Sequence, residues 1–210
     1  MSALWGIGSY VDAENVRVPW EIGSDEINRD IGVATNVLGE LGVAGNGVLW
    51  CSMLSQSGQF WPYICGTVMA GARLSCADAT AGEATRVAMF LKLMPYGAVF
   101  GVTEEILDGL DEMGRPYGDV FAGVRIVGAG PGAYERLAAA GLTPTRFVAC
   151  GPALAFGREP GGPAFVADAE WEVDAEAGQI CVTARQPRAQ TFARTPVGVR
   201  GTIVDGGISW

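Results

Sequence analysis

Residues 96–106, Tyr-Gly-Ala-Val-Phe-Gly-Val-Thr-Glu-Glu-Ile, contain a strand and the start of a helix. The apolar, β-rich run over 98–102 indicates a buried strand. Thr103 is a favourable N-cap, and the two acids after it suit the positive end of a helix dipole. The same alternation of apolar strand and helix recurs from about Asp25 to Pro152, which is typical of a parallel sheet with crossover helices.

Outward from this stretch, five helices are predicted: one between Ser24 and Gly42, one over 57–70, one over 82–93, one that begins after Thr103 and one that ends at Ala140. Strands are predicted over 47–54, 73–77, 124–127 and 146–150. After Pro152 the pattern changes to alternating strands, over 170–174 and 179–183, which a turn at Gly178 would join. Residues 201–204 are also β-like, and Val16–Trp20 predicts a short edge strand.

We therefore expect an α/β fold, a largely parallel sheet flanked by helices with a small C-terminal antiparallel β subdomain. The predicted parts are an N-terminal lead-in (1–23), an α/β core (24–152) and the β subdomain (153–210). Hydrophobic residues make up 49% of the chain, which is enough for a full core.

The net charge of −9 excludes nucleic acid and an anionic membrane surface as partners, since no basic stripe offsets it. No run approaches the roughly 18 apolar residues of a membrane span, and no signal peptide is evident, so a cytoplasmic location is expected. The chain has no His and five cysteines without a Cys-x-x-Cys pair, which argues against a metal site.

Several short motifs stand in a familiar order. Gly128-Ala129-Gly130-Pro131 resembles a Gly-Gly-Glu-Pro loop, and 148–153 takes the place of Tyr-Gly-x-Thr-Glu. Glu170-Trp171-Glu172-Val173 and Phe192-Ala193-Arg194 follow the order of Gly-Glu-Leu and Phe-Arg-Tyr motifs. On these motifs, residues 20–205 resemble the N-terminal domain of adenylate-forming enzymes, most closely the phenylacetate–CoA ligase branch.

The departures from that family fall on its catalytic positions. The phosphate-binding loop that ends in Lys has no counterpart, and the family's Mg²⁺-holding Glu would lie at 153–155, where it is absent. Val199 stands where the ribose-binding Asp would be. No counterpart of the mobile domain with the catalytic Lys is expected either. The resemblance therefore implies poor ATP binding and no complete ligase activity.

The resemblance implies a cleft that binds a small acyl, aryl or nucleotide ligand, with AMP or a CoA ester as the cofactor left open. The ligand-binding residues that we expect are Gly128, Ala129, Gly130, Pro131, Cys150, Gly151, Pro152, Ala153 and Arg194. Catalytic residues are not assigned. Two alternatives are a non-catalytic subunit, forming a homodimer or pairing with a complete ligase, and a repurposed biosynthetic enzyme that relies on carboxylates.

Each candidate also has a purely structural interpretation. Gly128–Gly132 suits a tight turn, and Cys150, with no His to activate it, suits a buried thiol. Arg188 and Arg194 suit salt bridges rather than ligand contact. The acidic run Asp168, Glu170 and Glu172 suits a solvated strand face, and Trp50, Phe60 and Trp61 suit the core.

Overall fold

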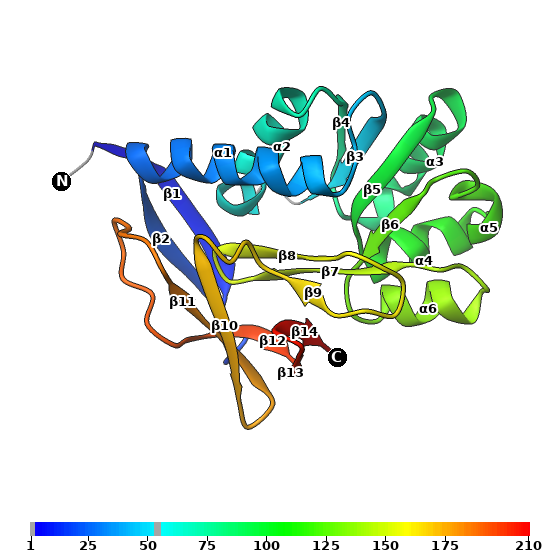
Figure 1. Ribbon diagram of the computed structural model, residues 1–210. Helices are drawn as coiled ribbons and strands as arrows, with labels where there is room; N and C mark the ends of the chain where they lie inside the picture. Colours follow the sequence, from blue (N-terminus) through cyan, green and yellow to red (C-terminus); the bar gives the residue numbers. More distant parts are fainter. Residues whose placement is uncertain (1–2, 53–55) are drawn as a thin grey trace.

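The structure is a computed structural model that describes residues 3–52 and 56–210 (Figure 1). Its largest element is a sheet with strand order β13-β14-β9-β8-β7-β6-β5-β3-β4. The strands are β3 (Gly47–Cys51), β4 (Arg73–Ala77), β5 (Tyr96–Val102), β6 (Ile126–Ala129), β7 (Thr145–Cys150), β8 (Ala153–Gly157), β9 (Ala164–Phe165), β13 (Thr202–Val204) and β14 (Gly207–Ser209). The pairings from β4 to β7 are parallel, and those from β7 to β13 are antiparallel.

Helices cover both faces of the parallel half of this sheet (Figure 1). The helices are α1 (Ser24–Glu40), α2 (Ser57–Met69), the 3-10 helix η2 (Ala81–Glu83), α3 (Ala84–Leu93), α4 (Glu104–Glu112), α5 (Tyr117–Val120) and α6 (Ala133–Ala139). Helices α1 and α2 pack on one face, and α3, α4 and α6 pack on the other. Every residue of β3 is buried, as expected of a parallel strand covered on both faces.

Trp50 of β3 is at the centre of the core beneath α1 and α2. Its ring lies within 6.2 Å, centroid to centroid, of five others, those of Phe60, Tyr63, Phe100, Phe147 and Phe156. The indole Nε1 donates a hydrogen bond to Thr67 Oγ1 at 2.9 Å, so the one polar atom of this buried side chain is satisfied. The core interpretation of Trp50 is therefore confirmed.

Two smaller sheets pack on the antiparallel half. One is the hairpin of β1 (Leu4–Val11) and β2 (Arg17–Gly23). The other is the sheet β10 (Trp171–Glu176), β11 (Gln179–Ala184) and β12 (Thr195–Arg200). Both share a core with β7 and β8, formed by side chains such as Trp20, Val148 and Val182. A bridge between Asp12 and Val197 joins the hairpin to β12.

The expected fold class is confirmed, including the separate antiparallel sheet. The boundary that we drew between residues 152 and 153 does not follow the strand pairing, because β8, β9, β13 and β14 extend the main sheet. Periodicity within single segments carries no information on which sheet a strand will join. The lead-in contains the β1–β2 hairpin, of which the sequence indicated only an edge strand at 16–20.

Most element boundaries agree with the sequence to within two residues. The Thr103 hydroxyl accepts a hydrogen bond from the backbone N–H of Ile106 at 3.4 Å, so the predicted cap is confirmed. The helix predicted between Ser24 and Gly42 is α1, which begins at Ser24 itself and has Gly23 as its N-cap. The strand expected over 47–54 ends at Cys51, and residues 53–54 lie outside the described ranges. Within those ranges, none of the helices combines the length and apolar character needed to cross a bilayer.

Candidate functional site

A cavity of about 520 Å³ opens at the carboxyl ends of the parallel strands. Its walls include Cys51 and Val102 at the ends of β3 and β5, Gly130 after β6 and Gly151 after β7. Residues of α2, β1 and β12 complete the wall. We call this space the strand-end cavity.

The strand order explains why the cavity lies there. The chain passes from β3 outward to β4 and then returns to place β5 on the other side of β3. Crossover connections therefore diverge between β3 and β5, and open α/β sheets bind ligands at such a switch point. Gly101 lies at this point with φ +85°, and a Cβ on it would overlap the carbonyl oxygen of Cys51. Only glycine fits this position.

The loop predicted at 128–131 divides into two parts. Gly128 and Ala129 are the last residues of β6, so this strand runs over 126–129 instead of the 124–127 expected. Gly130 and Pro131 line the strand-end cavity. The Gly130 N–H donates to the Val102 carbonyl oxygen at 3.0 Å, so it is already occupied by the fold.

The second predicted segment, 150–153, forms the turn between β7 and β8, and it too divides. Gly151 lines the strand-end cavity, whereas Pro152 and Ala153 line a separate small pocket of about 20 Å³. Cys150 is fully buried, and desolvation raises the pKa of its thiol to about 12. The thiol therefore stays protonated at neutral pH, and the structural interpretation of Cys150 agrees with its position.

Gln59 of α2 joins these segments, and the sequence analysis missed it. Its side-chain amide donates to the Ser9 carbonyl oxygen at 2.9 Å and to the Gly151 carbonyl oxygen at 3.1 Å. One side chain thereby ties α2 to both β1 and the β7–β8 turn. The sequence shows only that Gln59 stands in a helix without any charged residue; its near-complete burial and its two partners are visible in the structure alone.

Arg194 lies apart from the other predicted site residues. Its guanidinium pairs with Asp174 at 2.9 Å and with Glu176 at 3.3 Å on the exposed β10–β11 hairpin. The structure thus brings Gly130, Pro131 and Gly151 together at one cavity and places Arg194 elsewhere. Arg194 has the salt-bridging role that we weighed as its structural alternative.

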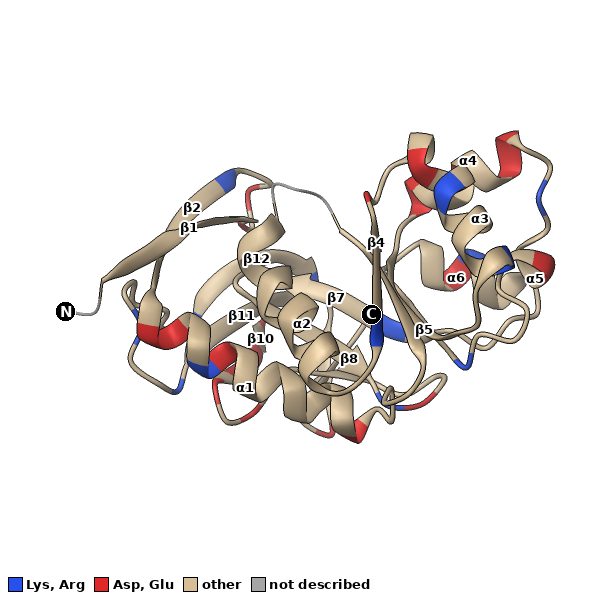
Figure 2. Ribbon diagram, turned by 90° about the horizontal axis from the view of Figure 1, so that it is seen from above, with Lys and Arg blue, Asp and Glu red and all other residues tan. Residues whose placement is uncertain are grey.

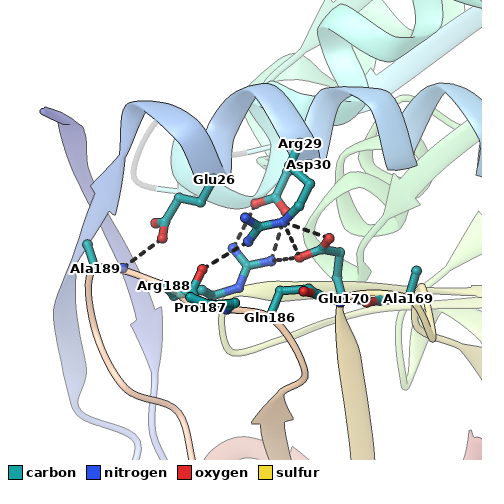
Figure 3. Close-up of polar contacts among 9 residues, drawn as sticks. All are labelled: Glu26, Arg29, Asp30, Ala169, Glu170, Gln186, Pro187, Arg188 and Ala189. Carbon is teal, nitrogen blue, oxygen red and sulfur yellow. Dashed lines mark hydrogen bonds and ion pairs between the residues drawn. The ribbon is translucent and has the colours of Figure 1, made fainter. Parts of the chain in front are cut away.

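Arg188 also has its structural role, in a buried network of charges (Figure 3). Its guanidinium donates to both oxygens of Asp30 at 2.8 Å and to Glu170 at 2.9 Å, and it stacks 4.0 Å from the centre of the Trp171 ring. Arg29 Nε donates to both Glu170 oxygens, at 2.7 and 2.9 Å. We call Arg29, Asp30, Glu170 and Arg188 the buried charge network.

The solvated face expected for Glu170 is therefore wrong. Glu170 precedes β10 and is only 3% exposed, because α1 and the segment around Arg188 cover it. Glu26, on the same helix face, accepts a hydrogen bond from the Ala189 N–H at 2.8 Å. These contacts fasten α1 to the three-stranded sheet and pair each charge of the network with an opposite charge.

The strand-end cavity itself has little charge. Among the described residues that line it, Arg200 is the one charged side chain, and there is no Asp or Glu. Much of the remaining wall is apolar, as with Phe60, Phe147 and Val148. The rival interpretation as a carboxylate-based enzyme therefore finds no support in the described wall.

Carboxylates gather instead just outside the Gly130–Pro131 corner. A second hollow shares Thr103, Gly130 and Pro131 with the cavity and is otherwise lined by Glu104, Glu105 and Asp108. A Cβ on Gly132 would overlap the Glu104 carboxylate, so this acid lies directly on the loop. The corner is acidic where a phosphate-binding loop would present cations or free N–H groups.

Solved structures with a similar arrangement of elements include CoA ligases. 2-Hydroxyisobutyryl-CoA ligase, in complex with 2-HIB-AMP and CoA, matches 93% of this chain with a TM-score of 0.67 and 15% sequence identity. The chain has the fold of an adenylate-forming CoA ligase. o-Succinylbenzoate CoA synthetase (MenE) from Bacillus subtilis matches 92% with a TM-score of 0.58 and 13% identity, and E. coli MenE matches 96% with a TM-score of 0.53 and 12% identity.

The likeness extends over nearly all of this chain but only part of each ligase. The chain covers 47% of the 2-hydroxyisobutyryl-CoA ligase chain, 43% of the B. subtilis MenE chain and 46% of the E. coli one, so it spans about half of their length. Comparisons with family profiles and with curated proteins gave no match. The resemblance drawn from the motifs is thus confirmed as a likeness of fold.

Proposed function

We propose that this chain binds a small acyl or aryl ligand in the strand-end cavity and lacks complete ATP-dependent ligase activity. The observation that carries the proposal is the cavity itself, about 520 Å³ at the switch point of the sheet, with largely apolar walls. Two solved structures with this fold hold acyl adenylates, 2-HIB-AMP and OSB-AMP. The scaffold is therefore one that can form an acyl site.

The absence of ATP chemistry is argued from charge. Transfer of a nucleotidyl group needs cations or a metal to neutralise the phosphates. Here Glu104, Glu105 and Asp108 border the Gly130–Pro131 corner, and the only lysine in the chain, Lys92, lines a different groove on α3. Asp108 is paired with Arg136 at 2.7 Å, so a triphosphate at that corner would meet the like charges of Glu104 and Glu105. The protein would then be a degenerate, ligase-like binding protein, and its five unpaired cysteines fit the cytoplasm.

A thermal-shift screen tests this function directly. The purified chain is heated with ATP and Mg²⁺, AMP, CoA, acyl-CoAs and aryl acids in parallel. A ligand present at 100 times its dissociation constant adds about 2.7 kcal/mol of stability, which raises the melting temperature measurably. Stabilisation by acids or CoA esters and not by ATP supports the proposal. Stabilisation by ATP and Mg²⁺ contradicts it, and so does calorimetry without heat for every acyl and aryl compound.

A second candidate, the non-catalytic subunit, has its own support in an uncharged surface. Residues 57–72, which include α2, contain no Asp, Glu, Lys or Arg, and α2 carries neither blue nor red in Figure 2. Its outward side chains Val68 and Met69 are 59% and 66% exposed, and Trp61 contacts Trp5 of β1 with 6.3 Å between ring centroids. Exposed apolar patches of this kind mark interaction sites.

The occupant that we propose for this face is a second copy of the chain. Two copies, each with a net charge of −9, could meet on this face without opposing like charges. Sedimentation velocity over a hundredfold range of concentration tests the idea. A dimer that the double variant Trp61→Glu, Val68→Glu converts to a monomer supports it. A monomer at all concentrations contradicts it and leaves the ligand-binding proposal untouched.

A further inference from the structure

Arg200, at the end of β12, differs from most arginines of this protein. In the part of the chain that the structure describes, its side chain has no hydrogen bond and no ion pair, although it lines the strand-end cavity. Arg188 and Arg194 by contrast each pair with two carboxylates. Arg200 is therefore a positive charge available at an otherwise uncharged cavity.

The surroundings limit how much negative charge a ligand can bring to this guanidinium. Beside Arg200 the wall consists of Gly198 and Val199, and no second cation lines the described part of the cavity. At the Gly130–Pro131 corner the adjoining hollow is acidic. One negative charge near Arg200 is stabilised, whereas further negative charges find no second cation in the described wall and meet the carboxylates of Glu104 and Glu105. Asp108 is already paired with Arg136 at 2.7 Å.

We propose that Arg200 selects ligands with a single negative charge on an apolar or aromatic body, and that it does so as the counter-ion of that charge. The inference rests on the ligand-binding function proposed above. It makes Arg200 the specificity-determining residue of the cavity. Arg200 directly follows Val199, which stands where the resemblance places the ribose-binding Asp of the family. Neutral amides and esters lose the ion pair, and phosphate monoesters bring excess charge.

The test uses matched compounds that share one aromatic body. Isothermal titration calorimetry compares 3-phenylpropionate, its neutral amide and 2-phenylethyl phosphate, at 50 and 300 mM NaCl. The proteins are the wild type, Arg200→Gln and Arg115→Gln. Arg115 is the matched control, since its side chain is likewise without a described partner but lines the groove on α3 instead. Circular dichroism confirms that all three proteins are folded.

We expect the wild type to bind the carboxylate about fivefold more tightly than the amide, the factor that an exposed ion pair worth about 1 kcal/mol provides. Arg200→Gln removes that preference and its dependence on salt, and Arg115→Gln keeps both. Equal binding of the carboxylate by the wild type and Arg200→Gln would overturn the role of Arg200 and leave the binding function standing. Tighter binding of the phosphate ester than of the carboxylate would overturn the limit to one charge. If the wild type binds none of the three, the binding function fails, and this inference with it.

Discussion

The buried charge network and the strand-end cavity use polar groups in opposite ways. In the network, two arginines pair with two carboxylates, and the side chains of Arg188 and Glu170 are only 3% and 4% exposed. In the cavity, the one charged side chain is exposed and has no partner among the described residues. Buried, paired charges therefore have a structural role in this protein, whereas the unpaired charge at an apolar wall identifies its candidate site.

The largest loss of stability is expected from a substitution of Arg188 in the buried charge network. Arg188→Met leaves Asp30 without its bidentate partner and Glu170 with Arg29 alone. Because the carboxylates stay buried, we expect the free energy of unfolding to fall by about 3–5 kcal/mol. Urea denaturation followed by tryptophan fluorescence measures the loss. A variant as stable as the wild type would show that the network contributes nothing to stability.

The next largest loss of stability is expected at Gly101, which lines the strand-end cavity. Gly101→Ala adds a Cβ that overlaps the Cys51 carbonyl oxygen, at a φ of +85°. We expect a loss of about 2–5 kcal/mol, from backbone strain and overpacking together. Gly141→Ala is the control, since Gly141 has φ +84° but open space around its Cβ position. The control should lose only the strain, about 1–2 kcal/mol. Equal losses would mean that no close contact exists at Gly101.

At alkaline pH, the stability of the fold depends on its buried cysteine thiols. Burial raises the pKa of Cys51 and of Cys150 from 9.0 to about 12, so the unfolded chain loses these protons first. This stability is fully present below pH 9 and is lost as the pH rises towards 12, by up to about 1.4 kcal/mol per pH unit for each thiol.

Denaturation between pH 8 and 10 measures this slope. Replacing both cysteines, as Cys51→Ala with Cys150→Ala, should flatten it. The Cys76→Ala control, which removes an exposed thiol, should keep most of it. An unchanged slope in the double variant would show that these thiols are not the groups that titrate.

The smallest effect is expected at Arg194. Arg194→Met removes the ion pairs with Asp174 and Glu176 of the β10–β11 hairpin, and all three side chains are exposed, so solvent screens the charges. Unfolding by urea should be indistinguishable from that of the wild type, and so should the calorimetric binding of the carboxylate used to test Arg200. A loss of binding would return Arg194 to the ligand site that the motifs first suggested.

Local chemistry made the parallel half of the fold predictable. The cap at Thr103 and the apolar strand before it can be recognised in the sequence, because both depend on neighbours within a few residues. The cavity was only partly predictable. Gly130 and Gly151 follow strands, which made them visible, but Gln59 and Arg200 reach the site from distant segments. Nothing in their own sequence neighbourhoods specifies that meeting.

The bridge between Asp12 and Val197 is one of the contacts expected to slow folding of the chain. It joins residues near opposite ends of the sequence, and the Arg29–Glu170 pair joins α1 to β10 across 141 positions. Contacts this far apart in sequence require large loops to close before they are rewarded, which slows folding. During synthesis the parallel half, made of local units, can form first. The hairpin and α1 can complete their contacts with the three-stranded sheet only after residues beyond 170 have left the ribosome.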